Sequence, residues 1–374
     1  MDQCDVLIAG GGPAGSSCAW KLRGTGLKTA ILDRQTFPRD KVCGGWITPA
    51  VLEALEIDPA EYARARMLQP ITGFRVSCMG AREVVASYGK PVSYGIRRYE
   101  FDEFLLKRSG ATLFQGMPLA QLERSGDQWI VNGRIRARML VGAGGTFCPV
   151  ARFLGAKVNR EIVVTAQEAE FQMDQCQLSG CAIRAEVPEL YFCRDMKGYG
   201  WCFRKHDILN IGLGRLDPHG LSRHVREFLN FLKAAGKISF DLPHALLGHA
   251  YLLYGKTSRN VAGDGVVLIG DAAGAAYAQS GEGIRPAVES GLLAAKVIAE
   301  AAGNYSRETL EPYRDLLAGR FGKPEEDWAT RIGQRLPAKV IGCVARRLLA
   351  TNWFAREIVL NRWFLHDNVP SLNF

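Results

Sequence analysis

The fold is decided by the segment Cys4-Asp5-Val6-Leu7-Ile8-Ala9-Gly10-Gly11-Gly12-Pro13-Ala14-Gly15. It predicts a short buried strand and a glycine-rich turn; Ser16 to Arg23 then predicts a helix, and Lys28 to Asp33 a second strand. In such a β-α-β unit Gly10 permits the tight turn, Gly12 lets the backbone approach a pyrophosphate, and Gly15 lets helix and strand pack closely. The predicted dinucleotide-binding residues are Gly10, Gly12, Pro13, Ala14, Gly15, Asp33 and Arg34.

A second segment favours FAD over NAD as the dinucleotide. Val267-Leu268-Ile269-Gly270-Asp271-Ala272-Ala273-Gly274 places a carboxylate just past a strand end, and Gly281-Glu282-Gly283-Ile284 then opens a helix that runs to Ala301. A second carboxylate and a second helix N-terminus suit a long ligand with two phosphates. The first site would hold the adenosine end of FAD, and the second the ribityl chain and the flavin ring.

The middle of the chain has a different pattern. Residues 71–96 and 162–215 are rich in Val, Tyr and Phe that alternate with polar residues, which predicts antiparallel hairpins. The predicted class is therefore α/β: a Rossmann-like FAD-binding domain, an interleaved antiparallel β-sheet substrate domain and a helical C-terminal tail. The expected boundaries are 1–75, 97–161 and 256–315 for the FAD-binding domain, 76–96 and 162–255 for the substrate domain, and 316–374 for the helical C-terminal region.

The order of these motifs resembles that of the FAD-dependent oxidoreductases of the aromatic hydroxylase superfamily. The resemblance implies that Asp33 binds the adenosine ribose, that Asp271 binds the pyrophosphate or ribityl region, and that Gly281, Gly283 and Ile284 present N–H groups to the flavin. It also implies that Arg98 lies close to the FAD. Two residues depart from the family pattern: Gly144 stands where an Asp is usual, and Ala278 where many members have a proline.

Within this superfamily, Lys41-Val42-Cys43-Gly44-Gly45 is similar to the Lys-x-Cys-Gly-Gly motif of geranylgeranyl reductases. Tyr199-x-Trp201-x-Phe203-x-Lys205 resembles the segment that shapes the substrate cavity in that family, although Met196 and Arg204 replace its usual prolines. The resemblance implies a reductase that saturates carbon–carbon double bonds of an isoprenoid or similar apolar substrate by hydride transfer from reduced flavin. Cys43, Gly44 and Gly45 would lie at the cofactor, with Cys43 tuning the flavin or supplying a proton.

Other interpretations of the same residues stay open. Cys43 can be a small buried hydrophobe, and the stripe of Tyr199, Trp201 and Phe203 can be plain core instead of a substrate pocket. Lys205 is expected to be a solvated lysine or an ion-pair partner. The alternative activity is an FAD-dependent monooxygenase that uses NAD(P)H and oxygen. A halogenase is disfavoured because the signature Trp-x-Trp-x-Ile-Pro is missing, and the histidines form no metal-ligand pattern.

Charge and hydropathy bear on the partners. The 374 residues carry a formal net charge of +9. The segment after Trp328 contains seven basic residues and only two acidic ones. A second GxGxxG unit is missing, so NAD(P)H would bind transiently, or an acidic carrier protein would deliver the electrons. No nucleic-acid motif is present. No apolar run is long enough for a membrane span and no signal peptide is apparent, which predicts a cytoplasmic protein.

The basic tail suggests a second kind of partner. Ile341, Val344, Ala345 and Leu348 would share one helical face, opposite Arg346 and Arg347. Such a helix suits an anionic membrane surface at the inner face, where a lipid substrate would enter. The alternative is a helix packed against the protein body with a solvated basic face.

Overall fold

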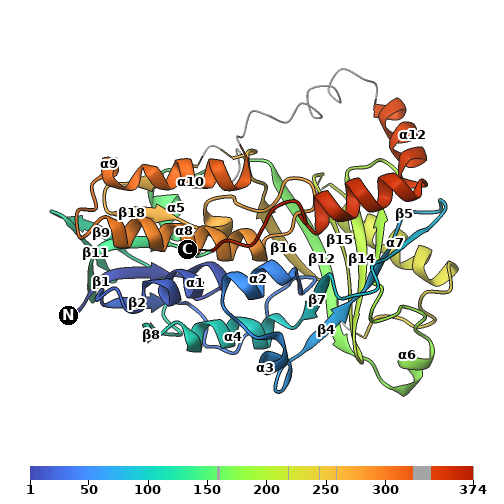
Figure 1. The fold of residues 1–374 in the computed structure, drawn as a ribbon, viewed down its shortest axis with the longest axis horizontal. Coiled ribbons are helices and arrows are strands. Elements are labelled where there is room, and N and C mark those ends of the chain that lie inside the picture. The colour runs from blue at the N-terminus through green and yellow to red at the C-terminus, as the bar shows by residue number, and fades with distance from the viewer. Residues whose placement is uncertain (158–160, 218, 244, 258, 323–337, 374) are drawn as a thin grey trace. The chain divides into compact units, whose positions relative to one another are not determined.

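The computed structural model describes residues 1–157, 161–217, 219–243, 245–257, 259–322 and 338–373 (Figure 1). The chain forms two compact units, each assembled from three chain segments. Unit 1 comprises 1–40, 99–163 and 251–326, and unit 2 comprises 41–98, 164–250 and 327–374. Residues 41–75, which the motifs assign to the FAD-binding domain, belong to unit 2. The reason is strand pairing: β5 (Gly73–Cys78) continues the sheet of that unit.

Unit 1 is built on a sheet with a parallel centre. Strand β1 (Asp2–Ala9) lies between β11 (Ile135–Gly142) and β2 (Thr29–Leu32), and β18 (Val266–Leu268) follows beyond β11, all in parallel. These strands are apolar runs because both faces of a parallel sheet are covered. The expected α/β class is thereby confirmed. The remaining strands of this sheet are β8 (Thr112–Phe114), β9 (Leu122–Ser125), β10 (Gln128–Val131) and β17 (Ala262–Gly263).

Two helices of unit 1 position the glycine-rich turns. Helix α1 (Pro13–Leu22) starts directly after the turn that ends β1, and it packs against α8 (Ile284–Glu300). Most residues of both helices are therefore buried. The other helices are α4 (Arg98–Arg108), α5 (Pro149–Phe153), the 3-10 helix η2 (Gly270–Ala272), α9 (Arg307–Leu310) and α10 (Pro312–Phe321).

Unit 2 contains the antiparallel sheet that the alternating pattern predicts. Strands β12 (Val163–Gln172), β15 (Ile208–Arg215) and β14 (Gly198–Lys205) are paired in that order, all antiparallel. The same sheet continues in β13 (Glu189–Phe192), β5 and β6 (Val84–Ser87) on one side and β16 (Leu247–Leu252) on the other. A smaller sheet contains β3 (Trp46–Ile47), β7 (Ser93–Ile96) and β4 (Leu68–Ile71).

Three of the described helices of unit 2 are short: α2 (Pro49–Ala54), α3 (Pro59–Ala63) and α6 (Gln175–Ser179). The helices α7 (Leu221–Ala234) and α12 (Ala338–Leu349) and the π-helix η3 (Phe354–Phe364) are longer. The start of the basic tail, including Arg331 and Arg335, lies outside the described residues. In the part of the chain that the structure describes, no helix combines the length and the apolar character that a membrane span requires.

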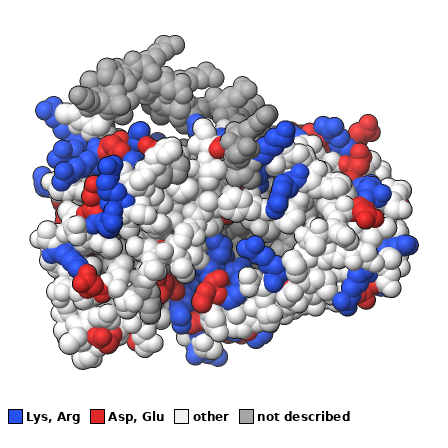
Figure 2. Space-filling view, turned by 180° about the vertical axis from the view of Figure 1, so that it is seen from behind, with Lys and Arg blue, Asp and Glu red and all other residues white. Residues whose placement is uncertain are grey.

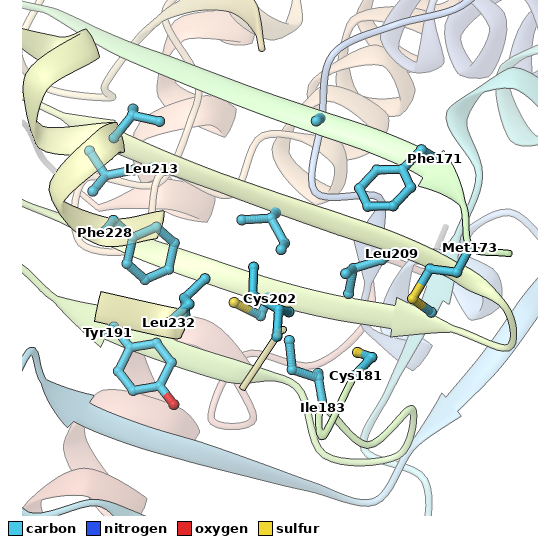
Figure 3. Close-up of a cluster of buried hydrophobic side chains, with 14 of the residues drawn as sticks. Phe171, Met173, Cys181, Ile183, Tyr191, Cys202, Leu209, Leu213, Phe228 and Leu232 are labelled. Carbon is cyan, nitrogen blue, oxygen red and sulfur yellow. The ribbon is translucent and has the colours of Figure 1, made fainter. Parts of the chain in front are cut away.

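The large sheet of unit 2 has two chemically different faces. One face forms the apolar core, in which Phe171, Leu209 and Leu213 pack against Phe228 and Leu232 of α7 (Figure 3). Because strand side chains alternate, the opposite face receives the intervening residues. Across β12, β15 and β14 these form two rows, one of Glu168, Gly212 and Trp201 and one of Glu170, Asn210 and Phe203. This second face, called the polar face below, carries part of the candidate site.

Candidate functional site

The turn between β1 and α1 is shaped to receive a phosphate group. Gly10 has a φ of +127°, and a Cβ there would lie 2.3 Å from the carbonyl oxygen of Ala143, so only glycine fits. Helix α1 starts with Gly12 as its N-cap and Pro13 in its first turn, without a side-chain cap. Its first N–H groups can therefore bind an anion.

Asp33 is fixed at the carboxyl end of β2. Its Oδ2 accepts a hydrogen bond of 2.7 Å from the Gly11 N–H, and its Oδ1 accepts one of 2.8 Å from the Gln35 N–H. The carboxylate is thereby held against the glycine turn while remaining partly exposed. Arg34 follows it and is exposed. This geometry suits the ribose contact that the resemblance implies.

Sequence reasoning missed a cation beside this turn. Arg39 forms an ion pair of 3.0 Å with the fully buried carboxylate of Asp102. Its Nη2 lies 3.6 Å from the position that a Cβ on Gly12 would take. A pyrophosphate bound at the turn would therefore meet a guanidinium as well as N–H groups. Arg39 belongs to no recognisable sequence motif, because its position depends on the ion pair with Asp102 of α4.

The second glycine segment lies next to the first. A Cβ on Gly270 would be 3.0 Å from the Cβ of Ala14, and a Cβ on Gly283 would be 3.5 Å from Oδ1 of Asp271. Helix α8 begins at Ile284 after Gly283, which has no side chain to cap it. Unit 1 therefore brings together the N-termini of α1 and α8, two carboxylates and a glycine cradle. These residues fit FAD.

A buried charge cluster supports the start of α8. Glu282 accepts a hydrogen bond of 2.7 Å from the Arg285 N–H, and the Arg285 guanidinium donates to Glu289 at 2.9 Å. Glu289 also accepts a hydrogen bond of 2.8 Å from the guanidinium of Arg320 in α10. Burial raises the pKa of Glu282 to about 7, although Arg285 opposes this shift. The cluster holds the segment Gly281–Ile284 in one conformation.

In unit 2, the peptide of Cys43 is held from both sides. Its N–H donates to Oε1 of Glu168, and its carbonyl oxygen accepts 3.1 Å from Nδ2 of Asn210. The Cys43 Sγ accepts a hydrogen bond of 3.4 Å from the Gly45 N–H. Gly45 has a φ of +63°, and a Cβ there would lie 2.3 Å from both the Ile96 carbonyl oxygen and Lys205 Nζ. The 41–45 loop is thereby fixed on the polar face.

The two hydrogen bonds from Glu168 and Asn210 to the Cys43 peptide, called the clamp below, belong to a larger hydrogen-bond network. The side-chain oxygen of Asn210 accepts a hydrogen bond of 2.7 Å from the indole N–H of Trp201, and its NH2 group donates one of 3.2 Å to Glu170. Glu170 forms an ion pair of 2.6 Å with Lys205, whose side chain is completely buried. The expectation of a solvated Lys205 is therefore wrong, whereas the expectation of an ion-pair partner is confirmed. The cause is the polar face, which supplies a carboxylate where solvent is excluded.

Tyr199, Trp201 and Phe203 contact a larger aromatic cluster. Phe203 stacks on Trp46 with centroids 6.5 Å apart, and Tyr199 meets Phe364 of η3 edge-on at 5.3 Å. Trp201 and Phe203 are buried, and Tyr199 is partly exposed. A Cβ on Gly212 would lie 2.2 Å from the Trp201 ring, so the indole lies flat over a residue without a side chain. The stripe thus combines core packing with one hydrogen-bonded indole.

A cation and an imidazole meet beside the same loop. Lys41 Nζ lies 3.0 Å from Nδ1 of His249. Burial, then Lys41 and then Arg98 lower the pKa of His249 to about 3, so its imidazole is neutral and accepts a hydrogen bond from Lys41. Arg98 is the first residue of α4 and lies close enough to act on this imidazole. In the described residues, no group of three or more His, Cys, Asp or Glu is arranged to hold a metal ion.

The structure therefore divides the predicted site residues between the two units. Unit 1 holds Gly10, Gly12, Pro13, Ala14, Gly15, Asp33, Arg34, Gly270, Asp271, Gly281, Gly283 and Ile284. Unit 2 holds Cys43, Gly44, Gly45, Arg98, Tyr199, Trp201 and Phe203. The polar residues that surround Cys43 were not predicted. The sequence offers one indication of them: Glu168 and Glu170 are two positions apart in a predicted strand and so lie on the same face. Which residues they meet on the neighbouring strands follows only from the register of the sheet.

Known proteins support this picture over nearly the whole chain. The family described as FAD binding domain matches residues 3–317. Digeranylgeranylglycerophospholipid reductase 3 of Methanosphaera stadtmanae is 28% identical over 342 residues, which cover 86% of this chain and 84% of that protein. Menaquinone reductase of Mycobacterium tuberculosis is 29% identical over 350 residues, which cover 86% of this chain and 81% of that one.

Two solved structures share the fold. A geranylgeranyl bacteriochlorophyll reductase-like protein from Thermoplasma acidophilum superposes with a TM-score of 0.80 at 21% identity, covering 98% of both chains. The halogenase PltM in complex with FAD superposes with a TM-score of 0.71 at 17% identity, covering 94% of this chain and 78% of that one. The resemblance to geranylgeranyl reductases drawn from the motifs is thus confirmed.

Proposed function

The chain belongs to the FAD binding domain family, and from this premise we propose that it reduces carbon–carbon double bonds of an isoprenoid or similarly apolar substrate. The observation that carries the proposal is the clamped peptide of Cys43 on a face that also presents Trp201 and Phe203. A free thiol beside buried aromatic side chains suits a substrate without polar groups at the reacting carbons. The names of the relatives, a lipid reductase and a quinone reductase, point to the same class of substrate.

Each group of residues has a proposed task. FAD, when bound, supplies a hydride donor. The turn at Gly10 to Gly15, with Asp33, Arg34 and Asp271, binds its phosphates and sugars, and Gly281 to Ile284 binds its ring. As the resemblance implies, Cys43, Gly44, Gly45 and Arg98 are also proposed to bind the cofactor. Tyr199, Trp201 and Phe203 exclude water from the apolar substrate, and Cys43 gives a proton from its Sγ.

The test uses the purified holoprotein under argon. Dithionite-reduced protein is mixed with a digeranylgeranylglycerophospholipid or with menaquinone, and the product is analysed by mass spectrometry. The proposal predicts reoxidation of the flavin together with the gain of two hydrogen atoms per saturated double bond of the isoprenoid chain, a gain that menaquinone keeps after its ring is reoxidised to the quinone in air. Product that forms only with oxygen, with one oxygen atom incorporated, would instead establish the alternative monooxygenase. The fold similarity to a halogenase makes this control necessary.

The electron donor is proposed to be NAD(P)H, bound transiently, or an acidic carrier protein. On the face shown in Figure 2, basic side chains lie among acidic ones, so a carrier would have to recognise a local basic group there instead of a uniform field. Bleaching of the flavin bands by NADH or NADPH under argon would identify a nicotinamide donor. Bleaching only by a reduced ferredoxin would identify a carrier.

We also propose contact with the inner face of a membrane through α12 and the residues after it. Val344, Leu348 and Trp353 are 51%, 40% and 66% exposed, and Arg346 and Arg347 are exposed beside them. Exposed apolar groups next to arginines suit an anionic lipid surface. The double variant V344D/L348D should lose cosedimentation with phosphatidylglycerol vesicles. The control variant V85D, which changes a valine on β6 that is 54% exposed, should still cosediment with these vesicles. Equal binding by both variants would contradict this role.

A further inference from the structure

Glu168 is a buried carboxyl group that contacts the peptide N–H of Cys43, the proposed catalytic cysteine. It lies on β12 and is 4% exposed. Its Oε1 accepts the hydrogen bond of the Cys43 N–H. Its Oε2 is buried and has no hydrogen-bond partner among the residues that the structure describes. A buried polar atom without a partner is costly, so its presence requires an explanation.

The charges around Glu168 come from three elements. Lys205 of β14 already forms its ion pair with Glu170 of β12, and Lys41 of the loop contacts the neutral His249. Glu168 therefore lacks a cation of its own. Burial is the largest influence and raises its pKa to about 7; the Cys43 N–H, Lys205 and Lys41 oppose this shift, and Glu170 adds to it. Near neutral pH this carboxyl group carries a proton for a large part of the time.

Arg97 is a further cation near this network. Its Nε lies 3.8 Å from Oε1 of Glu170, the same carboxylate that pairs with Lys205. A structural carboxylate would be expected to pair with one of these cations, as Glu170 does. Glu168 instead uses one oxygen to hold Cys43 and leaves the other for a proton.

We propose that Glu168 is the proton reservoir of Cys43: it positions the Cys43 peptide through Oε1 and restores the thiol proton after each turnover. This inference rests on the proposed reduction of double bonds. It goes further by assigning the source of the second hydrogen. Glu168 acts through Cys43 and is therefore a positioning and proton-supplying residue.

The proton balance of the cycle is closed. Reduced FAD, when bound, would be the source of the hydride for one alkene carbon. The other carbon takes a proton as the Cys43 S–H bond breaks, and a thiolate remains. The Glu168 O–H bond then breaks, the S–H bond re-forms, and the carboxylate takes a proton from water.

The test separates the first turnover from the following ones. Wild type, E168Q and E123Q are reduced with dithionite under argon and mixed with excess digeranylgeranylglycerophospholipid or menaquinone. In E168Q the first turnover should proceed within about threefold of wild type, since it needs no proton returned from residue 168, while later turnovers slow by about 100-fold. Wild-type steady-state turnover should fall as the pH rises through about 7, and E168Q should lose this dependence. E123Q makes the same chemical change at an exposed site on β9 and should behave like wild type.

Infrared spectroscopy gives an independent measurement. Two carbonyl bands of protonated carboxylic acids, from Glu168 and Glu282, should disappear in wild type with midpoints near pH 7, and in E168Q only the band of Glu282 should remain. The Glu168 band decides the question even where E168Q folds poorly. An active wild type with unaltered turnover and pH dependence in E168Q would overturn the role of Glu168 alone. A wild type that reduces neither compound, with its flavin bound and reducible, would overturn the proposed function and this role together.

Discussion

Asn210 donates a hydrogen bond of 3.1 Å to the carbonyl oxygen of Cys43 and, through its side-chain oxygen, accepts 2.7 Å from Trp201. One buried amide thus ties the cysteine loop to the aromatic stripe. The two sets of residues that the motifs identify separately are therefore one hydrogen-bonded arrangement, and disturbing Asn210 should affect both.

The substitution N210A should destabilise the protein by about 1–3 kcal/mol, because it leaves the buried Trp201 N–H and Cys43 carbonyl without this partner. Urea unfolding followed by tryptophan fluorescence measures the change. N304A removes an exposed asparagine and should cost much less. Equal losses in the two variants would show that the clamp contributes nothing.

The substitution G10A should abolish stable flavin binding. The added Cβ would meet the Ala143 carbonyl oxygen at 2.3 Å, and alanine is strained at a φ of +127°. The ratio of flavin to protein absorbance after gel filtration measures the loss. G24A also introduces alanine at a positive φ of +79°, but in open space, and should retain the flavin.

The substitution C43S should leave folding and flavin content intact but lower steady-state turnover by about 100-fold, because a hydroxyl group is a far poorer proton donor than a thiol. C343S, which changes an exposed cysteine on α12, is the control. If C43S turned over at the wild-type rate, Cys43 would be a packing residue.

The stability of the wild type should fall between about pH 4.5 and about pH 7. In this range the unfolded Glu168 ionises, while the folded protein, with its raised pKa, keeps the proton. The unfolded state therefore binds fewer protons, and the free energy of unfolding decreases by roughly 1–3 kcal/mol as the pH rises. E168Q should lack this part of the decrease. Thermal unfolding of both proteins near pH 5 and pH 8 tests the sign.

The substitution K205M should cost about 2–4 kcal/mol, since it leaves the Glu170 carboxylate beside a buried apolar group in place of its cation. The double variant K205M/E170Q should recover part of this loss. K107M breaks the exposed pair with Glu103 and should cost less than about 0.5 kcal/mol. No recovery in the double variant would contradict a coupled pair.

The sequence determined the parts of this protein whose causes are local. The segment from Cys4 to Gly15 predicts strand, turn and helix because the apolar run, the glycine conformations and the helix start all depend on neighbours in the chain. The structure confirms this with β1, the turn at Gly10 and α1. The antiparallel pattern of β12, β14 and β15 was readable for the same reason.

The tertiary structure alone decided which polar groups surround Cys43. Glu168 and Cys43 are 125 positions apart, and Asn210 and Cys43 are 167 apart. Their meeting depends on the register of β12, β15 and β14, where a shift by one residue would turn Glu168 and Asn210 into the apolar core. Burial of Lys205 and the raised pKa of Glu168 follow from that register, because exclusion of water is a property of the packed sheet and not of the residue.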